Sequence, residues 1–142
     1  MGIKDANNMG AAMAPAALDT LLTHFVDTGR TPSYYDAIIT GDLGLIGKEI
    51  LIELVEKSGF NIKSVYNDCG ALIFNKQEQD THSGGSGCGC IASVFSGYLY
   101  DELKKKNLKK ILLIATGALM NSMSAQQGES IPGIAQAIVI EI

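Results

Sequence analysis

Hydrophobic and polar positions along the chain alternate between the spacing of helices and the short apolar runs of strands. Pro15 opens the first helical pattern, as proline does at a first helical position, and Gly29 ends it. The apolar face of this helix is formed by Leu18, Leu21, Leu22, Phe25 and Val26. His24 falls on the opposite face, which predicts a surface histidine. The segments expected after it are a strand over 34–40, a helix over 46–59, a strand over 71–75, a helix over 90–103, and strands over 109–119 and 134–142.

This alternation predicts an α/β layered fold whose last two strands form an antiparallel pair. Both of those strands are apolar enough to be fully buried. The helix over 90–103 is apolar on nearly every side in its first half, so it requires cover all round. The predicted elements are too few to cover this helix on all sides. We therefore expect the chain to be half of a larger folded unit, or to form a tight dimer.

Composition narrows the class of protein. The 142 residues suffice for a single domain, 1–142, with its own core. A net charge of −4 provides no basic field, so we expect no nucleic acid as a partner. Three cysteines, an odd number, indicate free thiols in a reducing compartment. No apolar run approaches the roughly 20 residues that cross a bilayer, so we expect no transmembrane segment.

Candidate functional residues are most concentrated in HSGGSGCGC, residues 82–90. A zinc site from His82, Cys69, Cys88 and Cys90 is not expected, because C-x-C is a tighter spacing than that of structural zinc sites. A glycine-rich segment that runs into a helix can expose backbone N–H groups to an anion, or can merely allow close packing. Both interpretations stay open. His82 in such a loop favours function, as a donor to an oxyanion or as an acid or base.

Several stretches together resemble one family: KDANNMGAAMAPAALDTL, YDAIITGDLGLIGKEIL, NDCGALIF, HSGGSGCGC and ATGALMNSMSAQQGESIPGIAQAIVIE. They are similar to the C-terminal half of the stage V sporulation protein AD family, which is thiolase-like. The resemblance implies a two-half fold in which this chain is one βαβαβαββ half, the C-terminal one. The other half would carry the position of the thiolase nucleophile, so the chain would be a fragment of a larger protein.

The same resemblance permits a check on catalysis. Condensing enzymes of this superfamily place two polar catalytic groups in this half, and His82 lies at or near one of them. The other falls at Thr40-Gly41-Asp42, where histidine is absent, and Thr116 stands near the place of a thiolase cysteine. The resemblance therefore implies that the ligand-binding pocket is present and that the condensing activity is absent. The alternative is an acyltransferase or condensing enzyme that acts on an acyl thioester, with His82 as its catalytic group.

Members of the family are associated with uptake of dipicolinic acid into the developing spore. The resemblance therefore implies a non-catalytic subunit that binds this acid. The ligand-binding residues we expect are Asp42, His82, Gly85, Ser86, Gly87 and Cys88. We expect neither a metal site nor a cofactor, although Asp42 would repel a dianion unless a cation such as calcium accompanied the acid.

The resemblance also implies partners and a location. Besides dipicolinic acid, the partners would be the other SpoVA channel proteins and the N-terminal half of the same chain. We expect a homodimer, because thiolase-like proteins commonly dimerise. The location would be the cytoplasm or forespore, with the protein peripheral at the spore inner membrane.

Overall fold

A computed structural model describes residues 2–5, 7–75, 77–85 and 87–142. Its helices are α1 (Met9–Thr28), α2 (Gly44–Lys57), α3 (Cys69–Leu72), α4 (Cys90–Val94), α5 (Tyr100–Lys104) and α6 (Ser122–Gln126). Its strands are β1 (Ala37–Thr40), β2 (Tyr66–Asp68), β3 (Lys110–Ala118) and β4 (Gly133–Glu141). A 3-10 turn (Pro32–Tyr34) precedes β1, and a π-helical turn (Phe95–Leu99) joins α4 to α5 in one continuous helix.

The four strands form one mixed sheet in the order β2-β1-β3-β4. β1 lies at its centre and pairs in parallel with β2 and β3, with Ile38 opposite both Tyr66 and Leu112. β3 and β4 pair antiparallel along their whole lengths. The α/β fold class and the final antiparallel pair are thus confirmed. The sheet is compatible with the βαβαβαββ half implied by the resemblance, less its leading strand, since the first described element is a helix.

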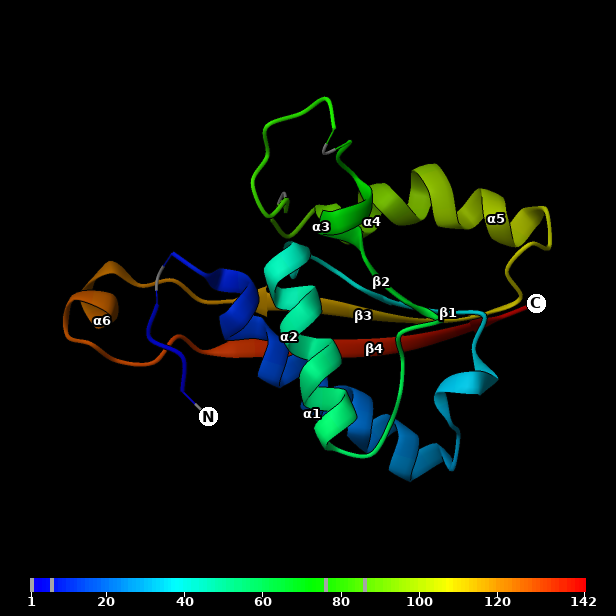
Figure 1. The fold of residues 1–142 in the computed structure, drawn as a ribbon, viewed down its shortest axis with the longest axis horizontal. Coiled ribbons are helices and arrows are strands. Elements are labelled where there is room, and N and C mark those ends of the chain that lie inside the picture. The colour runs from blue at the N-terminus through cyan, green and yellow to red at the C-terminus, as the bar shows by residue number, and fades with distance from the viewer. Residues whose placement is uncertain (1, 6, 76, 86) are drawn as a thin grey trace.

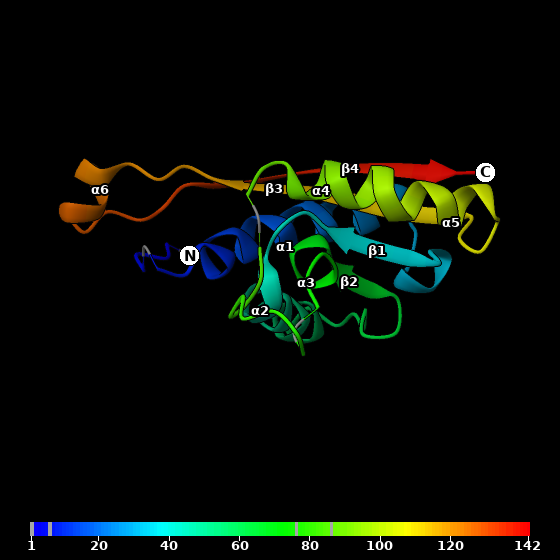
Figure 2. The same ribbon diagram turned by 90° about the horizontal axis from the view of Figure 1, so that it is seen from above.

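Helices cover both faces of the sheet, so the domain has three layers (Figure 1, Figure 2). α1 and α2 pack on one face, where Ile38 of β1 and Leu112 of β3 join their core. The α4–α5 helix packs on the other face, where the alternate residues Ile39 and Leu113 meet it. This alternation follows from the two-residue period of a strand, which sends successive side chains to opposite faces.

α1 begins six residues before the predicted start at Pro15, which lies inside the helix. The Asn8 side chain caps it by accepting a hydrogen bond of 3.0 Å from the backbone N–H of Ala11. The first turns persist because they pack closely on α2: a Cβ added at Gly10 would come 2.1 Å from the carbonyl oxygen of Leu43. Tertiary packing therefore outweighs the cost of an internal proline here.

Two predictions about the faces of α1 are wrong. Val26, expected on the buried face, is 77% exposed, although its neighbour Phe25 is buried in the core. His24, expected at the surface, is partly buried, and its Nε2 atom is hydrogen-bonded to the hydroxyl of Tyr35. Burial, assisted by the Arg30 cation, lowers the pKa of His24 below its ordinary value.

The strand predicted over 71–75 is also wrong. The strand lies upstream, as β2, and the residues that follow it turn at once into the short helix α3. Asp68 ends the strand and caps this helix, since its carboxylate accepts a hydrogen bond from the backbone N–H of Ala71. Local capping by an aspartate therefore overrides the strand propensity of the apolar run that follows.

Burial of the last two strands and of the α4–α5 helix is incomplete. β3 is buried from Ile111 to Ile114 and is less covered beyond it, while β4 is an edge strand with Ile134 and Ile138 60% and 59% exposed. Tyr98 and Tyr100 of the long helix are each half exposed. The prediction of two fully buried strands is wrong for this chain, and the uncovered surface accords with the expected shortage of cover.

Candidate functional site

The carboxyl ends of β1, β2 and β3 meet at one edge of the sheet, because these strands run parallel. In open α/β sheets, ligands bind outside this edge. Polar side chains lie there, among them Asp42 just past β1, Asp68 at the end of β2, and Thr116 in β3. The described residues of the glycine-rich loop, 82–85 and 87–90, lie beside them: the backbone N–H of Leu45 donates to the carbonyl oxygen of Ser83 at 2.7 Å, and that of Gly87 donates to Asp42. This edge is therefore the place to look for a site.

Asp68 forms the rigid base of this edge. Its side chain is fully buried, and its carboxylate accepts four hydrogen bonds. The donors are the Thr40 hydroxyl at 2.6 Å and the backbone N–H groups of Leu43, Gly44 and Ala71 at 2.8, 2.9 and 3.2 Å. A buried carboxylate is stable when donors surround it in this way, and this one fixes the loop that carries Asp42.

Asp42 is held at the centre of the edge by two elements. The backbone N–H of Gly87 donates to its Oδ2 atom at 2.5 Å, and its own backbone N–H donates to the Thr116 hydroxyl at 3.2 Å. Gly85 passes so close that a Cβ there would lie 2.7 Å from the Asp42 Oδ1 atom, and its φ is +107°. Only glycine meets both conditions without strain. The loop thus fixes the position of the Asp42 carboxylate.

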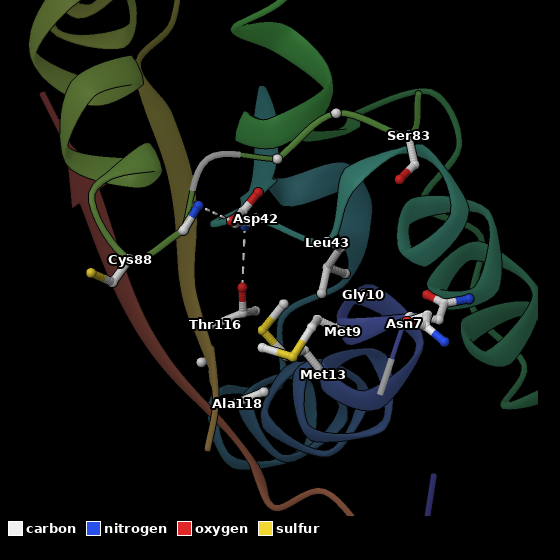
Figure 3. Close-up of a pocket in the computed structure, with 15 residues that line it drawn as sticks. Asn7, Met9, Gly10, Met13, Asp42, Leu43, Ser83, Cys88, Thr116 and Ala118 are labelled. Atoms are coloured by element: carbon white, nitrogen blue, oxygen red, sulfur yellow. Dashed lines mark hydrogen bonds between the residues drawn. The ribbon is translucent and has the colours of Figure 1, made fainter. Parts of the chain in front are cut away.

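A cavity of about 400 Å³ opens in front of these groups (Figure 3). Its described lining consists of Asn7, Asn8, Met9, Gly10, Met13, Asp42, Leu43, Ser83, Gly84, Gly85, Gly87, Cys88, Thr116, Gly117 and Ala118. Asp42 is the only charged side chain among them. Asp42 and Thr116 contribute polar groups to the lining, while Met9 and Met13 from α1 contribute apolar surface that lies beside Thr116 and away from Asp42. A volume of this size suits a small ligand with one polar and one apolar side.

The structure brings together most of the residues predicted from the sequence. Asp42, Gly85, Gly87 and Cys88 all line the cavity. Ser86 lies outside the described residues. His82 is not part of the described lining; its side chain is 90% exposed, with Nδ1 3.8 Å from a carboxylate oxygen of Asp80. The role predicted for His82 thus stays a prediction that this geometry does not favour.

In the described part of the loop, two backbone N–H groups that could bind an anion already have partners within the protein. The Gly87 amide, one of the two expected to bind a ligand, already donates to Asp42. At the start of α4, the Cys90 amide donates to the Gly87 carbonyl oxygen at 3.0 Å. The Asp42 carboxylate therefore already accepts a hydrogen bond from one of the amides predicted to bind a ligand.

The three cysteines differ in environment. Cys69 and Cys90 are fully buried, whereas Cys88 is exposed beside the cavity. Burial, with the Asp68 carboxylate nearby, raises the pKa of the Cys69 thiol to about 12. Within the described residues, no group of three or more histidine, cysteine or acidic side chains could hold a metal ion.

Sequence reasoning missed the far side of the cavity. This side is formed by Asn7, Met9 and Met13, just before or within the first turns of α1. Because the helix was predicted to start at Pro15, no secondary structure was predicted for these three residues. Thr116 was noted only for not being cysteine, although its position in the central strand β3 places its hydroxyl beside Asp42. The signal for Asp68 was available, since an aspartate at the end of a strand before a small residue is a common helix cap.

Fold and site together define a three-layer α/β domain with a ligand-sized cavity at the carboxyl ends of its parallel strands. Comparison with known proteins makes the assignment more specific. The model of the family described as Stage V sporulation protein AD matches residues 1–141. The chain is 41% identical to Stage V sporulation protein AD of Bacillus subtilis (strain 168) over 141 residues. The chain therefore belongs to the stage V sporulation protein AD family, which connects it with sporulation.

The match covers 99% of this chain but only 41% of the Bacillus subtilis protein, so the chain spans less than half the length of that relative. Among the described helices, none is long and apolar enough to cross a membrane.

Proposed function

We propose that this domain is a non-catalytic small-molecule-binding part of the sporulation machinery, and that its ligand is dipicolinic acid taken up together with calcium. The observation that carries the proposal is the cavity of about 400 Å³ in which Asp42 is the only charged side chain of the described lining. Its dimensions suit a single aromatic ring with polar substituents. The family assignment supports a role in sporulation.

Calcium resolves the conflict of charge. Dipicolinate is a dianion at neutral pH, and the Asp42 carboxylate would repel it. Calcium takes six to eight oxygen ligands and accepts carboxylates, hydroxyls and amide oxygens readily. Asp42, Thr116 and the amide side chain of Asn7 offer such donors on the cavity wall. The acid's own carboxylates would supply further ligands, so no protein cage of three acidic groups is needed.

Binding is favoured over turnover by the position of His82. An acyltransferase would need this imidazole beside the reacting carbonyl, within hydrogen-bond reach. Its side chain is 90% exposed and does not line the cavity. Asp42, which does, is an acceptor tied to the Gly87 amide and offers no positive charge to an oxyanion.

The test is calorimetric titration of dipicolinate into the full natural chain, with and without calcium. We expect binding that requires calcium, and a loss of about tenfold or more in affinity for Asp42→Asn, which keeps the shape and removes the charge. His82→Ala is the matched control and should change affinity by less than about twofold. Absence of binding in the presence of calcium would overturn the proposal, as would transfer of an acyl group from a thioester to the intact protein.

The uncovered face of the sheet suggests the first partner. An apolar groove of about 340 Å³ runs between the α4–α5 helix and β4, lined by residues that include Ile91, Phe95, Leu113 and Ile138. We propose that the N-terminal half of the same chain packs here, since the chain covers 41% of its longer relative. Homodimerisation and contact with the other SpoVA channel proteins, at the spore inner membrane, would then involve the assembled protein.

This packing can be tested by charge insertion. In the full natural chain, Ile138→Asp should lower the thermal unfolding midpoint by several degrees, because it would bury a carboxylate in an apolar interface. Val26→Asp replaces a residue of α1 that is 77% exposed, and it should change the midpoint little. Equal effects of the two substitutions would show that the groove remains open.

A further inference from the structure

The apolar wall of the cavity is built from two thioethers. Met9 and Met13 stand four residues apart in α1, so they lie on the same face of the helix, one turn apart. Both line the cavity away from Asp42, and Figure 3 shows their side chains in the space between Thr116 and Leu43. No other methionine belongs to the described lining.

These side chains belong to a rigid part of the molecule. Met13 is only 5% exposed, and Met9 is partly buried against the same core. The turn between them touches α2 through Gly10, where any larger residue would collide with the Leu43 carbonyl group. Leu43 is itself held by the donation of its N–H to Asp68 at 2.8 Å. The methionine wall and the Asp42 wall are therefore connected through one loop.

We propose that Met9 and Met13 are specificity-determining residues, which select ligands with a flat aromatic ring by packing their thioethers against its face. The proposal rests on the proposed function, because it concerns the ligand of the same cavity. It adds a division of labour: the Asp42 wall binds the cation and carboxylate end of the ligand, and the methionine wall recognises the ring.

Thioether chemistry suits this role. The sulfur is polarisable and makes favourable contacts with aromatic rings, and it neither donates a strong hydrogen bond nor carries a charge. An unbranched side chain also follows the shape of a ring more closely than a branched one. An aliphatic dicarboxylate of similar span offers the same two carboxylates to calcium, but it has neither a π face nor the ring nitrogen of dipicolinate. A loss of affinity that follows from a methionine substitution and is confined to the aromatic ligand therefore reports recognition of the ring.

The experiment compares two probes at fixed calcium in the full natural chain: pyridine-2,6-dicarboxylate and glutarate. Met9→Ala should weaken binding of the aromatic probe by about two- to tenfold and leave glutarate within about twofold, so that the ratio of the two dissociation constants falls. Met9→Leu and Met13→Leu preserve volume and folding, and they should lower the ratio to a smaller extent. Met123→Ala, at an α6 side chain that is 65% exposed, is the matched control and should leave the ratio unchanged.

A second measurement needs no variant. Mild peroxide converts exposed methionines to sulfoxides, which mass spectrometry assigns to individual residues. Calcium with the aromatic probe should slow oxidation of Met9 and leave Met123 at its original rate. An unchanged ratio in the variants, or an unchanged Met9 rate, would overturn the inference while the wild-type protein still binds. If the wild-type protein binds neither probe, the proposed function itself fails, and the two failures are thus distinguishable.

Discussion

Asp68 and Thr40 face each other across the parallel β1–β2 pair, and the Thr40 hydroxyl donates a hydrogen bond of 2.6 Å to the Asp68 carboxylate. Tyr66 extends this contact, since its hydroxyl lies 2.7 Å from the Thr40 oxygen. Thr40 donates its single proton to Asp68, so Tyr66 is the donor to Thr40. Burial raises the pKa of Tyr66, which keeps this proton in place. The chain of hydrogen bonds is therefore directed toward the carboxylate.

Asp68→Ala should lower the free energy of unfolding by about 3 kcal/mol, because it leaves the buried N–H groups of Leu43 and Gly44 without an acceptor. Urea denaturation followed by circular dichroism measures the change. Asp80→Ala, at a side chain that is 92% exposed, should stay within about 0.5 kcal/mol of the parent. If Asp68→Ala loses no more free energy of unfolding than Asp80→Ala, the buried hydrogen bonds contribute little to stability.

Gly85→Ala should reduce affinity for calcium dipicolinate more than Gly87→Ala. Both glycines have positive φ, so both substitutions strain the loop by about 1–2 kcal/mol. A Cβ at Gly85 would press on the Asp42 carboxylate at 2.7 Å, whereas a Cβ at Gly87 would meet open space. Comparison of the two dissociation constants by calorimetry removes the shared strain. Equal losses of affinity in the two variants would show that the close contact of Gly85 with Asp42 does not affect ligand binding.

Stability should fall as the pH is lowered below about 6.5, and His24 should contribute to this fall. Its pKa is lowered in the folded state by burial and by Arg30, against an ordinary value of 6.5, so the unfolded chain binds the proton more readily. The contribution is therefore present above pH 6.5 and is lost as the pH falls through the folded-state pKa. Thermal melts across this range should show a weaker pH dependence for His24→Gln than for the parent.

Cys88 should react with iodoacetamide well before the other two thiols. It is exposed, whereas Cys69 and Cys90 are fully buried, and the pKa of about 12 at Cys69 leaves almost no thiolate at neutral pH. Because Cys88 lines the cavity, calcium dipicolinate should slow its alkylation. Peptide mass spectrometry at timed intervals follows each cysteine separately. Rapid labelling of Cys69 in the native protein would contradict this burial.

Local patterns predicted the longer helices and the strands β1, β3 and β4, but not the place of β2 or the short helices α3 and α6. The helix expected over 46–59 corresponds to α2, and the antiparallel pair at the end is present as β3 and β4. Such elements carry their signal within ten to fifteen residues, through spacing and breakers. The start of α1 could not be found in this way, because the contact of Gly10 with Leu43 involves residues far apart in the chain.

The site was predictable in part for a similar reason. Asp42 and the glycines of the loop stood out by residue type and by resemblance, and the structure brings them together. The orientation of His82 depends on the backbone of its loop, where its φ is +49°, and no local pattern shows that the side chain turns outward. Met9 and Met13 look like ordinary core residues, since only the folded structure places them in the lining of the cavity.

The central position of β1 has a consequence for how the chain folds. Asp36, just before this strand, binds the backbone N–H of Lys110 from 74 residues away, and β1 then pairs with β3 along its length. A ribosome must therefore release nearly the whole domain before the middle of the sheet can close. Pairings this distant slow folding, so the nascent chain waits with β1 exposed along one side. We expect chaperones to meet this protein at that stage of its synthesis.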